Sequence, residues 1–301
     1  MLKKPDWLRV PHSDSNNILM TADLIEELGL NTVCDAANCP NRTECFSNKT
    51  ATFMILGNLC TRNCAFCNVI NGTPLPVNEQ EPKNIATAIN KLGLSYVVIT
   101  SVTRDDLPDE GALQFANVVR EIRNQVPNVI IELLIPDISA KNIKTITSAS
   151  PDVIGHNMET VQSLYSAVRP EANYNRSLEV LNSIKQANSK VHTKSGLMLG
   201  LGESREEVLK LFDDLLDVGC EFLTIGQYLS PSKNHFPVKE YITPEEFSEY
   251  AKIAKEKGFR YVASAPFVRS SYKAHEFYSA SEDSSTSTSS SSSIGGGASV
   301  S

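Results

Sequence analysis

The chain lacks several features that mark common functional classes. Lys and Arg number 28 against 35 Asp and Glu, so a net charge of −7 leaves no positive surplus for the phosphates of a nucleic acid. No apolar run approaches the ~20 residues that a helix needs to cross a bilayer. The start, MLKKPDWLRV, has neither a long apolar stretch nor the Arg- and Ser-rich bias of a transit peptide. We therefore expect a cytoplasmic protein with no nucleic-acid partner and no membrane partner.

What is present is a globular composition with regular alternation. The 301 residues are 41% hydrophobic and 21% charged, which suits one large α/β domain with a real core. Apolar, strand-like runs occupy residues 51–57, 95–102, 128–135, 151–157, 190–199 and 221–229. Amphipathic, helix-like runs occupy residues 81–93, 110–126, 176–188, 203–219 and 243–258.

Apolar strands that alternate with amphipathic helices indicate a parallel sheet covered by helices. Six such units predict an α/β fold, a partial (βα)6 barrel of the TIM type. The active site of such a fold forms at the C-terminal ends of the strands. We expect the loop after residues 51–57 to lie there, together with residues 104–106, 157–159 and 227–228.

The pattern divides the chain into three parts. Residues 1–50 form an N-terminal extension with one short helix near residues 21–28, and residues 51–278 form the barrel with its C-terminal segment. From residue 279 the composition changes to Ser, Thr and Gly. With almost nothing to bury, this tail of residues 279–301 is expected to be disordered.

The cysteines are clustered. Six of the seven fall within residues 34–67, whereas Cys220 stands alone in an apolar segment, as a small hydrophobic core residue does. Clustered thiols in a reducing compartment more often bind metal or do chemistry than form disulfides. We call Cys34, Cys39 and Cys45 the upstream triad, and Cys60, Cys64 and Cys67 the downstream triad.

The downstream triad reads CTRNCAFC, with spacings of three and two residues. Three thiolates on one short loop can hold three corners of a 4Fe–4S cluster. No fourth cysteine follows closely, so one iron is left open to a ligand. An electron-transfer ferredoxin supplies four cysteines, and structural zinc sites favour paired knuckles. The spacing favours a cluster with an open iron.

The upstream triad reads CDAANCPNRTEC, with spacings of four and five residues. Read alone, it is compatible with a second cluster, a zinc site or a redox relay. Its position before the first barrel strand allows it to cap the top of the barrel and to face the downstream triad.

The downstream triad, with Phe66 before its last cysteine, resembles the signature of the radical-SAM superfamily. Paired with the upstream triad, it resembles the lipoyl synthase family. The resemblance covers about residues 3–278 and continues through SVTRDDLPDEGA, HNMETV, VRPEANYNRSLEVL, TKSGLMLGLGE, GQYLSPSKNH and PFVRSSY. It implies that the partial barrel is of the radical-SAM type.

The resemblance also implies the chemistry. Two 4Fe–4S clusters and the cosubstrate S-adenosylmethionine (SAM) are expected, and the downstream triad holds the cluster whose open iron binds SAM. The upstream triad holds an auxiliary cluster whose fourth ligand is a serine of RSSY, Ser271, with Ser270 as the alternative. The reaction it implies is the radical insertion of two sulfur atoms, taken from the auxiliary cluster, at C6 and C8 of a protein-bound octanoyl-lysine. An alkyl C–H bond has no acidity to tune, so no side chain is assigned as an acid or base.

Six polar residues are expected to contact SAM: Arg104, Asp105, Asn157, Glu159, Arg169 and Lys194. Each equally fits a surface salt bridge or a helix cap. His235 could contact the substrate or be an ordinary loop histidine. The glycines of SGLMLGLGE are expected to form tight turns. Two positions depart from the family pattern, since Glu110 and Ala265 stand where glycines are usual and put the local loop geometry in doubt.

The expected partners follow from the same resemblance. They are octanoylated lipoyl domains or the glycine-cleavage H protein, a ferredoxin- or flavodoxin-type electron donor, and iron–sulfur carrier proteins. Two other functions compete. A biotin synthase-like sulfurtransferase or methylthiotransferase is not expected to carry the upstream triad together with RSSY. A non-catalytic electron carrier or zinc-stabilised binding module needs neither an open iron nor a barrel of ~200 residues.

Overall fold

The structure is a computed structural model that describes residues 3–9, 16–272 and 274, so the expected disordered tail lies outside the described residues. The strands are β1 Asn31–Thr32, β2 Thr52–Ile55, β3 Leu59–Cys60, β4 Ile70–Asn71, β5 Tyr96–Ser101, β6 Ile130–Leu134, β7 Val153–Gly155, β8 His192–Leu199, β9 Phe222–Gln227 and β10 Tyr261–Ser264. The helices are η1 Asp6–Leu8, α1 Asn16–Glu27, α2 Val33–Ala36, α3 Arg42–Ser47, α4 Glu81–Leu92, α5 Ala112–Gln125, α6 Ala140–Thr147, η2 Gln162–Leu164, α7 Tyr165–Val168, α8 Tyr174–Ala187, α9 Arg205–Asp217 and α10 Pro244–Lys257.

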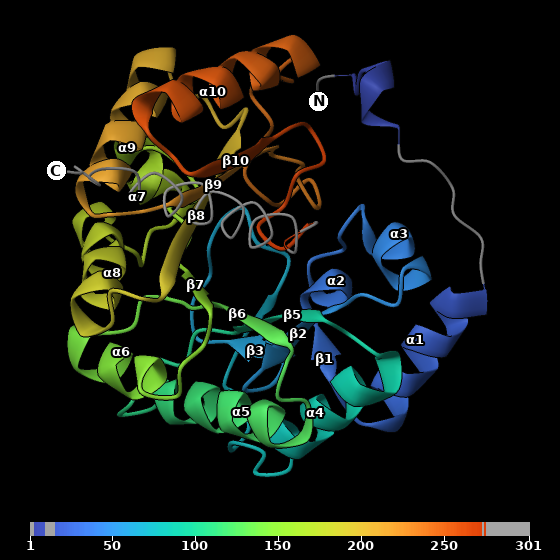
Figure 1. Cartoon of the computed structure of the whole chain (residues 1–301). Helices are drawn as coiled ribbons and strands as arrows, with labels where there is room; N and C mark the ends of the chain where they lie inside the picture. Colours follow the sequence, from blue (N-terminus) through green and yellow to red (C-terminus); the bar gives the residue numbers. More distant parts are fainter. Residues whose placement is uncertain (1–2, 10–15, 273, 275–301) are drawn as a thin grey trace, which may run out of the picture.

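One sheet organises the molecule. Its strand order is β1-β2-β5-β6-β7-β8-β9-β10, and every neighbouring pair from β2 onward is parallel. Six of these strands coincide with the six predicted runs. Helices α4, α5, α6, α8, α9 and α10 form an arc around the outer face of the curved sheet (Figure 1). The predicted partial barrel of βα units is therefore confirmed.

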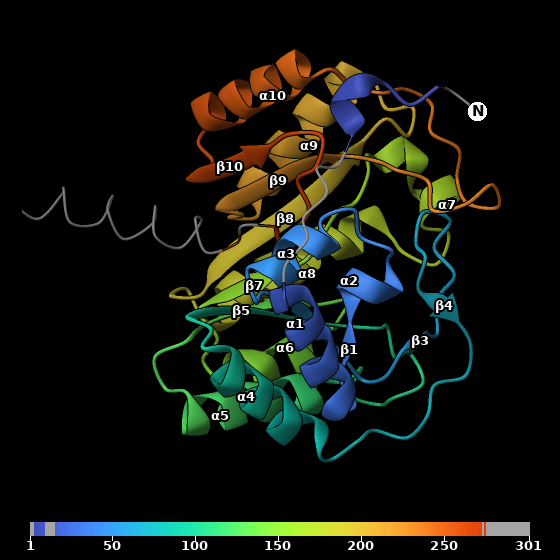
Figure 2. The same cartoon turned by 90° about the vertical axis from the view of Figure 1, so that its right-hand side faces the viewer.

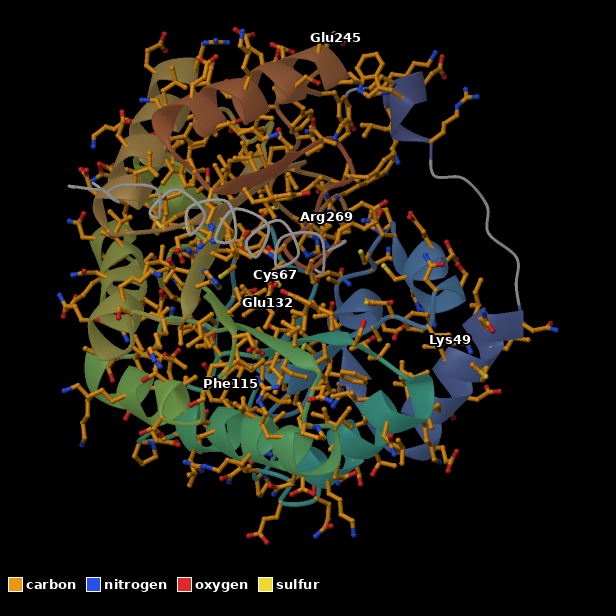
Figure 3. The ribbon with its side chains drawn as sticks, viewed as in Figure 1. Lys49, Cys67, Phe115, Glu132, Glu245 and Arg269 are labelled. Carbon is orange, nitrogen blue, oxygen red and sulfur yellow. The ribbon has the colours of Figure 1, made fainter. Side chains whose placement is uncertain are left out.

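The helices start and pack as their sequences dictate. Helices α9 and α10 each begin with a capping box, Ser204 with Glu207 and Thr243 with Glu246, which satisfies backbone N–H groups at the helix start. Their apolar sides join the strands in one core, in which Phe115 of α5 lies completely buried between helix and sheet (Figure 3). The barrel wall is thereby held rigid around its strand ends.

Among the strands of the main sheet and the helices that cover it, three elements were not predicted. Strand β10 adds a seventh parallel strand beside β9, and only Val262 of its four residues is buried. An edge strand this short gives a weak apolar signal. Helix α6 is only eight residues long and contains two threonines, so its amphipathic pattern is brief. Strand β1 pairs antiparallel with β2, on the edge opposite to β10.

The N-terminal extension packs directly against the barrel. Leu24 and Ile25 of α1 and Phe46 of α3 belong to the same apolar core as Phe53 of β2. The Thr21 hydroxyl, completely buried, donates to the Phe46 carbonyl at 3.1 Å and ties α1 to α3. Helices α1, α2 and α3 lie together beside β1, on the side of the barrel away from α6 and α8 (Figures 1 and 2).

The two departures from the family pattern affect the backbone differently. Glu110 keeps a left-handed φ of +56°, a conformation that costs a non-glycine residue about 1–2 kcal/mol. Its carboxylate compensates by accepting hydrogen bonds from the Ser139 backbone N–H at 2.7 Å and from Asn142 at 3.0 Å. Ala265, in contrast, has no positive φ, so glycine is not required there.

No described helix is both long and apolar enough to span a membrane.

Candidate functional site

A cavity of about 530 Å³ opens at the C-terminal ends of the parallel strands. All six clustered cysteines line it, together with ends of β2, β5, β6, β8 and β9 and with residues 268–272 from the other end of the chain. Cys67 and Arg269 lie near the centre of the molecule, whereas Lys49 and Glu245 lie at its periphery (Figure 3). The fold therefore brings the upstream and downstream triads to one enclosed space, where the strand-end rule predicted the site.

The loop of the downstream triad is fastened to three neighbouring elements. The Thr61 N–H donates to the carbonyl of Thr103, just after β5, at 3.1 Å, and the Ala65 N–H donates to the carbonyl of Val168, at the end of α7, at 3.0 Å. The Ala65 carbonyl accepts from the Phe236 N–H at 2.8 Å. Nearby, the Cys60 sulfur accepts from the Thr103 N–H at 3.3 Å. These bonds fix the path of the loop and the direction of its thiols.

Arg62, inside the first spacer of the downstream triad, anchors the same loop through its side chain. Its guanidinium forms two hydrogen bonds of 2.8 Å to Asp105 and a further one to Asp137, which is buried. Burial works against the charged Asp137 carboxylate, but His156, Arg169 and Arg62 outweigh it and hold the pKa of Asp137 well below its usual range. The loop is thus tied to the ends of β5 and β6 by ion pairs.

His235 also holds this loop. Its Nε2 lies 3.1 Å from the Cys67 carbonyl and its Nδ1 lies 2.8 Å from the Ser232 hydroxyl, and His235 does not line the cavity. This geometry favours the loop histidine over the substrate contact. Cys220 is buried in the core and its thiol donates to the Phe222 carbonyl at 3.4 Å, as expected of an inert core thiol.

The upstream triad is carried by two short helices. Cys34 lies on α2, whose first turn is capped by the Thr32 hydroxyl, and Cys45 lies on α3. Cys39 lies between them, and its backbone N–H donates to the Cys34 carbonyl at 3.0 Å. The Cys45 N–H donates to the Asn41 carbonyl at 2.9 Å. Local turns therefore set the spacing of these three thiols.

The C-terminal segment, residues 267–272, closes the upstream side of the cavity. The Asn41 amide donates to the Phe267 carbonyl at 2.8 Å, across 226 positions of sequence, and the Tyr272 hydroxyl donates to Glu44 at 3.0 Å, across 228 positions. Gly196 of β8 and Gly226 of β9 make room for this segment inside the barrel. A Cβ on Gly226 would lie 2.1 Å from the Val268 carbonyl oxygen, so any larger residue in β9 would displace the segment.

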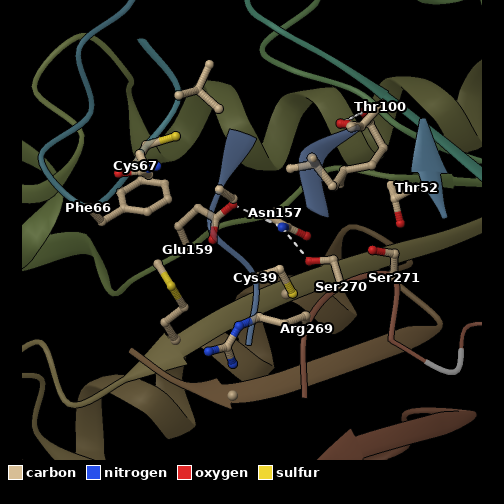
Figure 4. A pocket seen from close by; sticks show the side chains of 18 of the residues that line it. Cys39, Thr52, Phe66, Cys67, Thr100, Asn157, Glu159, Arg269, Ser270 and Ser271 are labelled. Atoms are coloured by element: carbon tan, nitrogen blue, oxygen red, sulfur yellow. Dashed lines mark hydrogen bonds between the residues drawn. The ribbon is translucent and has the colours of Figure 1, made fainter. Parts of the chain in front are cut away.

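The two serines of this segment both face the cavity but differ in their partners (Figure 4). Ser270 accepts a hydrogen bond of 2.6 Å from the Asn157 amide. The Ser271 hydroxyl has no hydrogen-bond partner among the described residues, and Cys39 lines the same cavity. Ser271 is therefore the serine whose oxygen is available to a ligand.

Burial sets the protonation of the thiols. It raises the pKa of Cys34 and Cys64 to about 11 and of Cys45 and Cys67 to about 12, and it also raises the pKa of Cys39. Such thiols stay neutral at pH 7 until a cation replaces their protons. These thiols therefore suit ligands of a soft metal better than free nucleophiles, which need a lowered pKa.

The chemistry of the donors indicates which group they suit. Among the described residues, no three Cys, His, Asp or Glu side chains converge closely enough to hold one metal ion. Two groups of three thiols around one cavity fit the corners of two iron–sulfur clusters by the softness of the ligands.

The six residues predicted to contact SAM fall into two groups. Asn157, Glu159 and Arg169 line the cavity, and Glu159 and Arg169 lie near enough to Cys64 to affect the pKa of its thiol. Arg169 is held by hydrogen bonds from its Nη1 to the carbonyls of Asn157 and Met158, and its Nε is buried without a partner among the described residues. A buried guanidinium N–H of this kind suits a carboxylate ligand.

Arg104, Asp105 and Lys194 do not line the cavity. Arg104 forms two hydrogen bonds of 2.8 Å to Asp106, and Asp105 pairs with Arg62. Lys194 is buried within the barrel, where its Nζ bonds both oxygens of Glu132 at 2.8 and 3.0 Å. These three side chains hold the walls of the site, and a SAM contact for them stays a prediction.

Two cavity residues were not singled out from the sequence. His156, almost fully buried, has its Nδ1 2.9 Å from the Ile135 carbonyl and its Nε2 3.2 Å from Asp137. Arg269 lines the cavity beside Cys39 and donates to the carbonyl of Val268 at 2.6 Å. His156 could have been found from the sequence only because it is a polar residue directly after an apolar strand. Arg269 could have been found only as the first residue of the RSSY motif.

Comparison with known proteins identifies the class and then the family. The model of the Radical SAM superfamily matches residues 54–215, and the crystal structure of methylornithine synthase shares the fold, with a TM-score of 0.55 at 15% identity over 84% of each chain. The chain is thus a radical-SAM protein.

A lipoyl synthase of Caldicellulosiruptor saccharolyticus is 54% identical over 276 residues, which are 91% of this chain and 97% of that protein. A lipoyl synthase of Alkaliphilus metalliredigens is 50% identical over 283 residues, which are 93% and 98% of the two chains. The chain therefore belongs to the lipoyl synthase family, whose members are radical-SAM sulfurtransferases. Membership of the superfamily implies a 4Fe–4S cluster and SAM.

Proposed function

We propose that this protein inserts two sulfur atoms, at C6 and C8, into an octanoyl chain carried on a lysine of another protein, in the biosynthesis of protein-bound lipoate. The observation that carries the proposal is the meeting of both triads and the RSSY segment around one cavity of about 530 Å³. Sulfur insertion of this kind needs a radical source and a sulfur donor within reach of one substrate chain. One cavity lined by two sets of soft ligands meets that need.

The downstream triad would hold the 4Fe–4S cluster whose open iron binds SAM. When bound, this cluster supplies the electron that cleaves SAM and so the radical that removes hydrogen from the alkyl chain. The chain's own residues orient the cosubstrate. Arg169 suits its carboxylate, and Asn157 and Glu159 suit its amino group or its ribose hydroxyls.

The upstream triad and Ser271 would hold the auxiliary cluster, the proposed source of sulfur. A serine alkoxide is a harder and weaker ligand for iron than a thiolate. A corner held in this way can be released more readily than the three cysteine corners. The three hydrogen-bonded ties of residues 267–272 to Asn41, Glu44 and Asn157 support the assignment of this role to the segment.

The lining of the cavity suits an alkyl substrate. The cavity is largely apolar, with Met54, Val69, Leu134, Leu197, Met198 and Leu229 among its lining residues. Apolar walls bind a hydrocarbon chain and exclude water from a reactive radical. No side chain is needed as an acid or base, because the hydrogen is taken from an unactivated carbon.

The partners and the division of the chain are proposed on the same basis. We propose octanoylated lipoyl domains or the glycine-cleavage H protein as substrates, a ferredoxin- or flavodoxin-type protein as electron donor, and iron–sulfur carriers as the source of new clusters. Residues 1–50 then serve as the auxiliary-cluster extension of the barrel in residues 51–278. A cytoplasmic location agrees with this reducing chemistry.

The proposal is tested by an anaerobic single-turnover assay. Reconstituted protein, dithionite, SAM and an octanoyl-lysine peptide are combined, and the peptide is followed by mass spectrometry, with Cys39→Ala beside wild type. A lipoyl product from wild type, together with SAM cleavage but no sulfur addition by Cys39→Ala, is the expected result. SAM cleavage without sulfur addition by cluster-loaded wild type would refute the proposed reaction, and no cleavage at all would refute the radical chemistry.

A further inference from the structure

One side chain joins the two halves of the cavity. The Asn157 amide nitrogen donates to Glu159 Oε1 at 3.0 Å and to Ser270 Oγ at 2.6 Å, as the dashed lines of Figure 4 show. A primary amide nitrogen carries two N–H groups, so these bonds use both of them. Glu159 lies on the side assigned to SAM, and Ser270 directly precedes Ser271. A shift of either partner therefore moves a group shared with the other.

The backbone at Glu159 is fixed. Its N–H donates to the Gly196 carbonyl at 3.0 Å, and its carbonyl accepts from the Met198 N–H at 2.9 Å, so β8 holds it on both sides. Its φ of +64° is left-handed, a conformation that persists in a non-glycine residue only where the surroundings enforce it. A ligand that contacts Glu159 can therefore displace or order only its side chain.

The link is packed tightly against the barrel wall. A Cβ on Gly196 would lie 2.6 Å from Thr224 Oγ1 in the neighbouring strand, 2.9 Å from Asn157 Oδ1 and 3.1 Å from Ser270 Oγ. These distances are shorter than ordinary contacts, so Asn157 and Ser270 meet directly over the bare backbone of β8. Gly196 therefore allows the Asn157 and Ser270 side chains to approach the backbone of β8 closely. A methyl group at this position would separate the two side chains.

We propose that Ser270 is a positioning residue that couples the binding of SAM to the placement of Ser271, through Asn157 and Glu159. The inference rests on the function proposed above. When Glu159 is engaged by SAM, the Asn157 amide is ordered with it, and Ser270 and its neighbour are held at the auxiliary site. When SAM is absent, the serine corner is held less firmly, which favours exchange of the auxiliary cluster between turnovers.

The test is hydrogen–deuterium exchange of the two-cluster protein under anaerobic conditions, with and without SAM and with no reductant. In wild type, SAM is expected to slow exchange in the peptide of residues 265–272 by about five-fold, the effect of one hydrogen bond. In Ser270→Ala this protection disappears, whereas protection of residues 60–67 persists and shows that SAM is bound. Gly196→Ala, which keeps all three polar side chains, is expected to lose the same protection.

Ser264→Ala is the matched control, because the Ser264 hydroxyl bonds the Phe247 carbonyl at 2.7 Å, away from the cavity. It should retain the wild-type response of residues 265–272. Full protection of that peptide in Ser270→Ala or Gly196→Ala would overturn the coupling. Absence of SAM protection at residues 60–67 in cluster-loaded wild type would instead refute the proposed function itself.

Discussion

The two triads face one cavity but differ in which segment of the chain packs beside them. The downstream triad lies on eight consecutive residues after β2, and every thiol it needs is local. The thiols of the upstream triad are local as well, but a segment more than 220 positions away covers them and bonds to Asn41 and Glu44 beside them. Burial raises the thiol pKa in both, so the two sites share an environment and differ in construction.

This difference has a functional consequence. A site whose ligands share one loop keeps its geometry as long as that loop is anchored. A site whose proposed serine ligand comes from the far end of the chain loses that ligand whenever the distant segment moves. The proposed radical source therefore has the local site, and the proposed sulfur donor, which must be dismantled and rebuilt, has the one that can be opened.

The largest effect is expected at the downstream triad. Cys64→Ala should abolish SAM cleavage and sulfur insertion together and reduce the iron content from about eight to about four per chain. Iron analysis and detection of 5′-deoxyadenosine measure both. Cys220→Ala is the control, since it removes a core thiol with no role in the cavity. Residual SAM cleavage by Cys64→Ala well above background would contradict the assignment of this triad.

Gly226→Ala should separate the two sites. The added Cβ, 2.1 Å from the Val268 carbonyl oxygen, forces residues 267–272 away from the upstream triad. We expect loss of lipoyl product and of auxiliary iron, with SAM cleavage retained within a few-fold. Gly258→Ala, in an open turn where a Cβ meets nothing within 4 Å, is the comparison for backbone strain alone. Equal loss of both activities in Gly226→Ala would mean that the sites are not separable.

A smaller effect is expected from Tyr272→Phe, which removes only the hydroxyl that donates to Glu44. One charge-assisted hydrogen bond contributes about 1.5–3 kcal/mol, so loss of auxiliary iron to a chelator should accelerate roughly 10-fold or more. The rate is followed by absorbance, with the downstream cluster as internal standard. Tyr250→Phe, on α10 away from the cavity, should leave both rates unchanged.

The smallest effect is a pH dependence of the downstream anchor. Hydrogen bonds from Arg62 lower the pKa of Asp105 below its usual value, so its contribution to stability is present above the unfolded pKa of about 3.9 and is lost as the pH falls below it. Because Asp105 is partly exposed, Asp105→Asn should cost at most about 1 kcal/mol. Thermal unfolding of apoprotein should show a constant difference from pH 8 to 5 that shrinks below pH 4. A difference that grows on acidification would contradict the ion-pair account.

The sequence predicted much of the fold and part of the site. All six strand runs are confirmed, because strands buried on both faces are mostly apolar, even though β6 and β8 carry the buried pair Glu132 and Lys194. Strand β10 was missed, because an edge strand of four residues carries too few buried positions. Arg104 and Asp105 were predicted to contact SAM because they follow β5. Their side chains instead pair with Asp106 and Arg62, and position along the chain does not determine such pairing.

By itself the sequence determined the alternation of strands and helices and the two groups of thiols, since both follow from residue type and spacing along the chain. Only the tertiary structure decided that the triads share a cavity, that Ser270 bonds Asn157 while Ser271 keeps its oxygen available, and that Gly196 and Gly226 admit the C-terminal segment. Those are relations between residues far apart in sequence. They depend on distances of a few ångströms that packing sets and that no local pattern encodes.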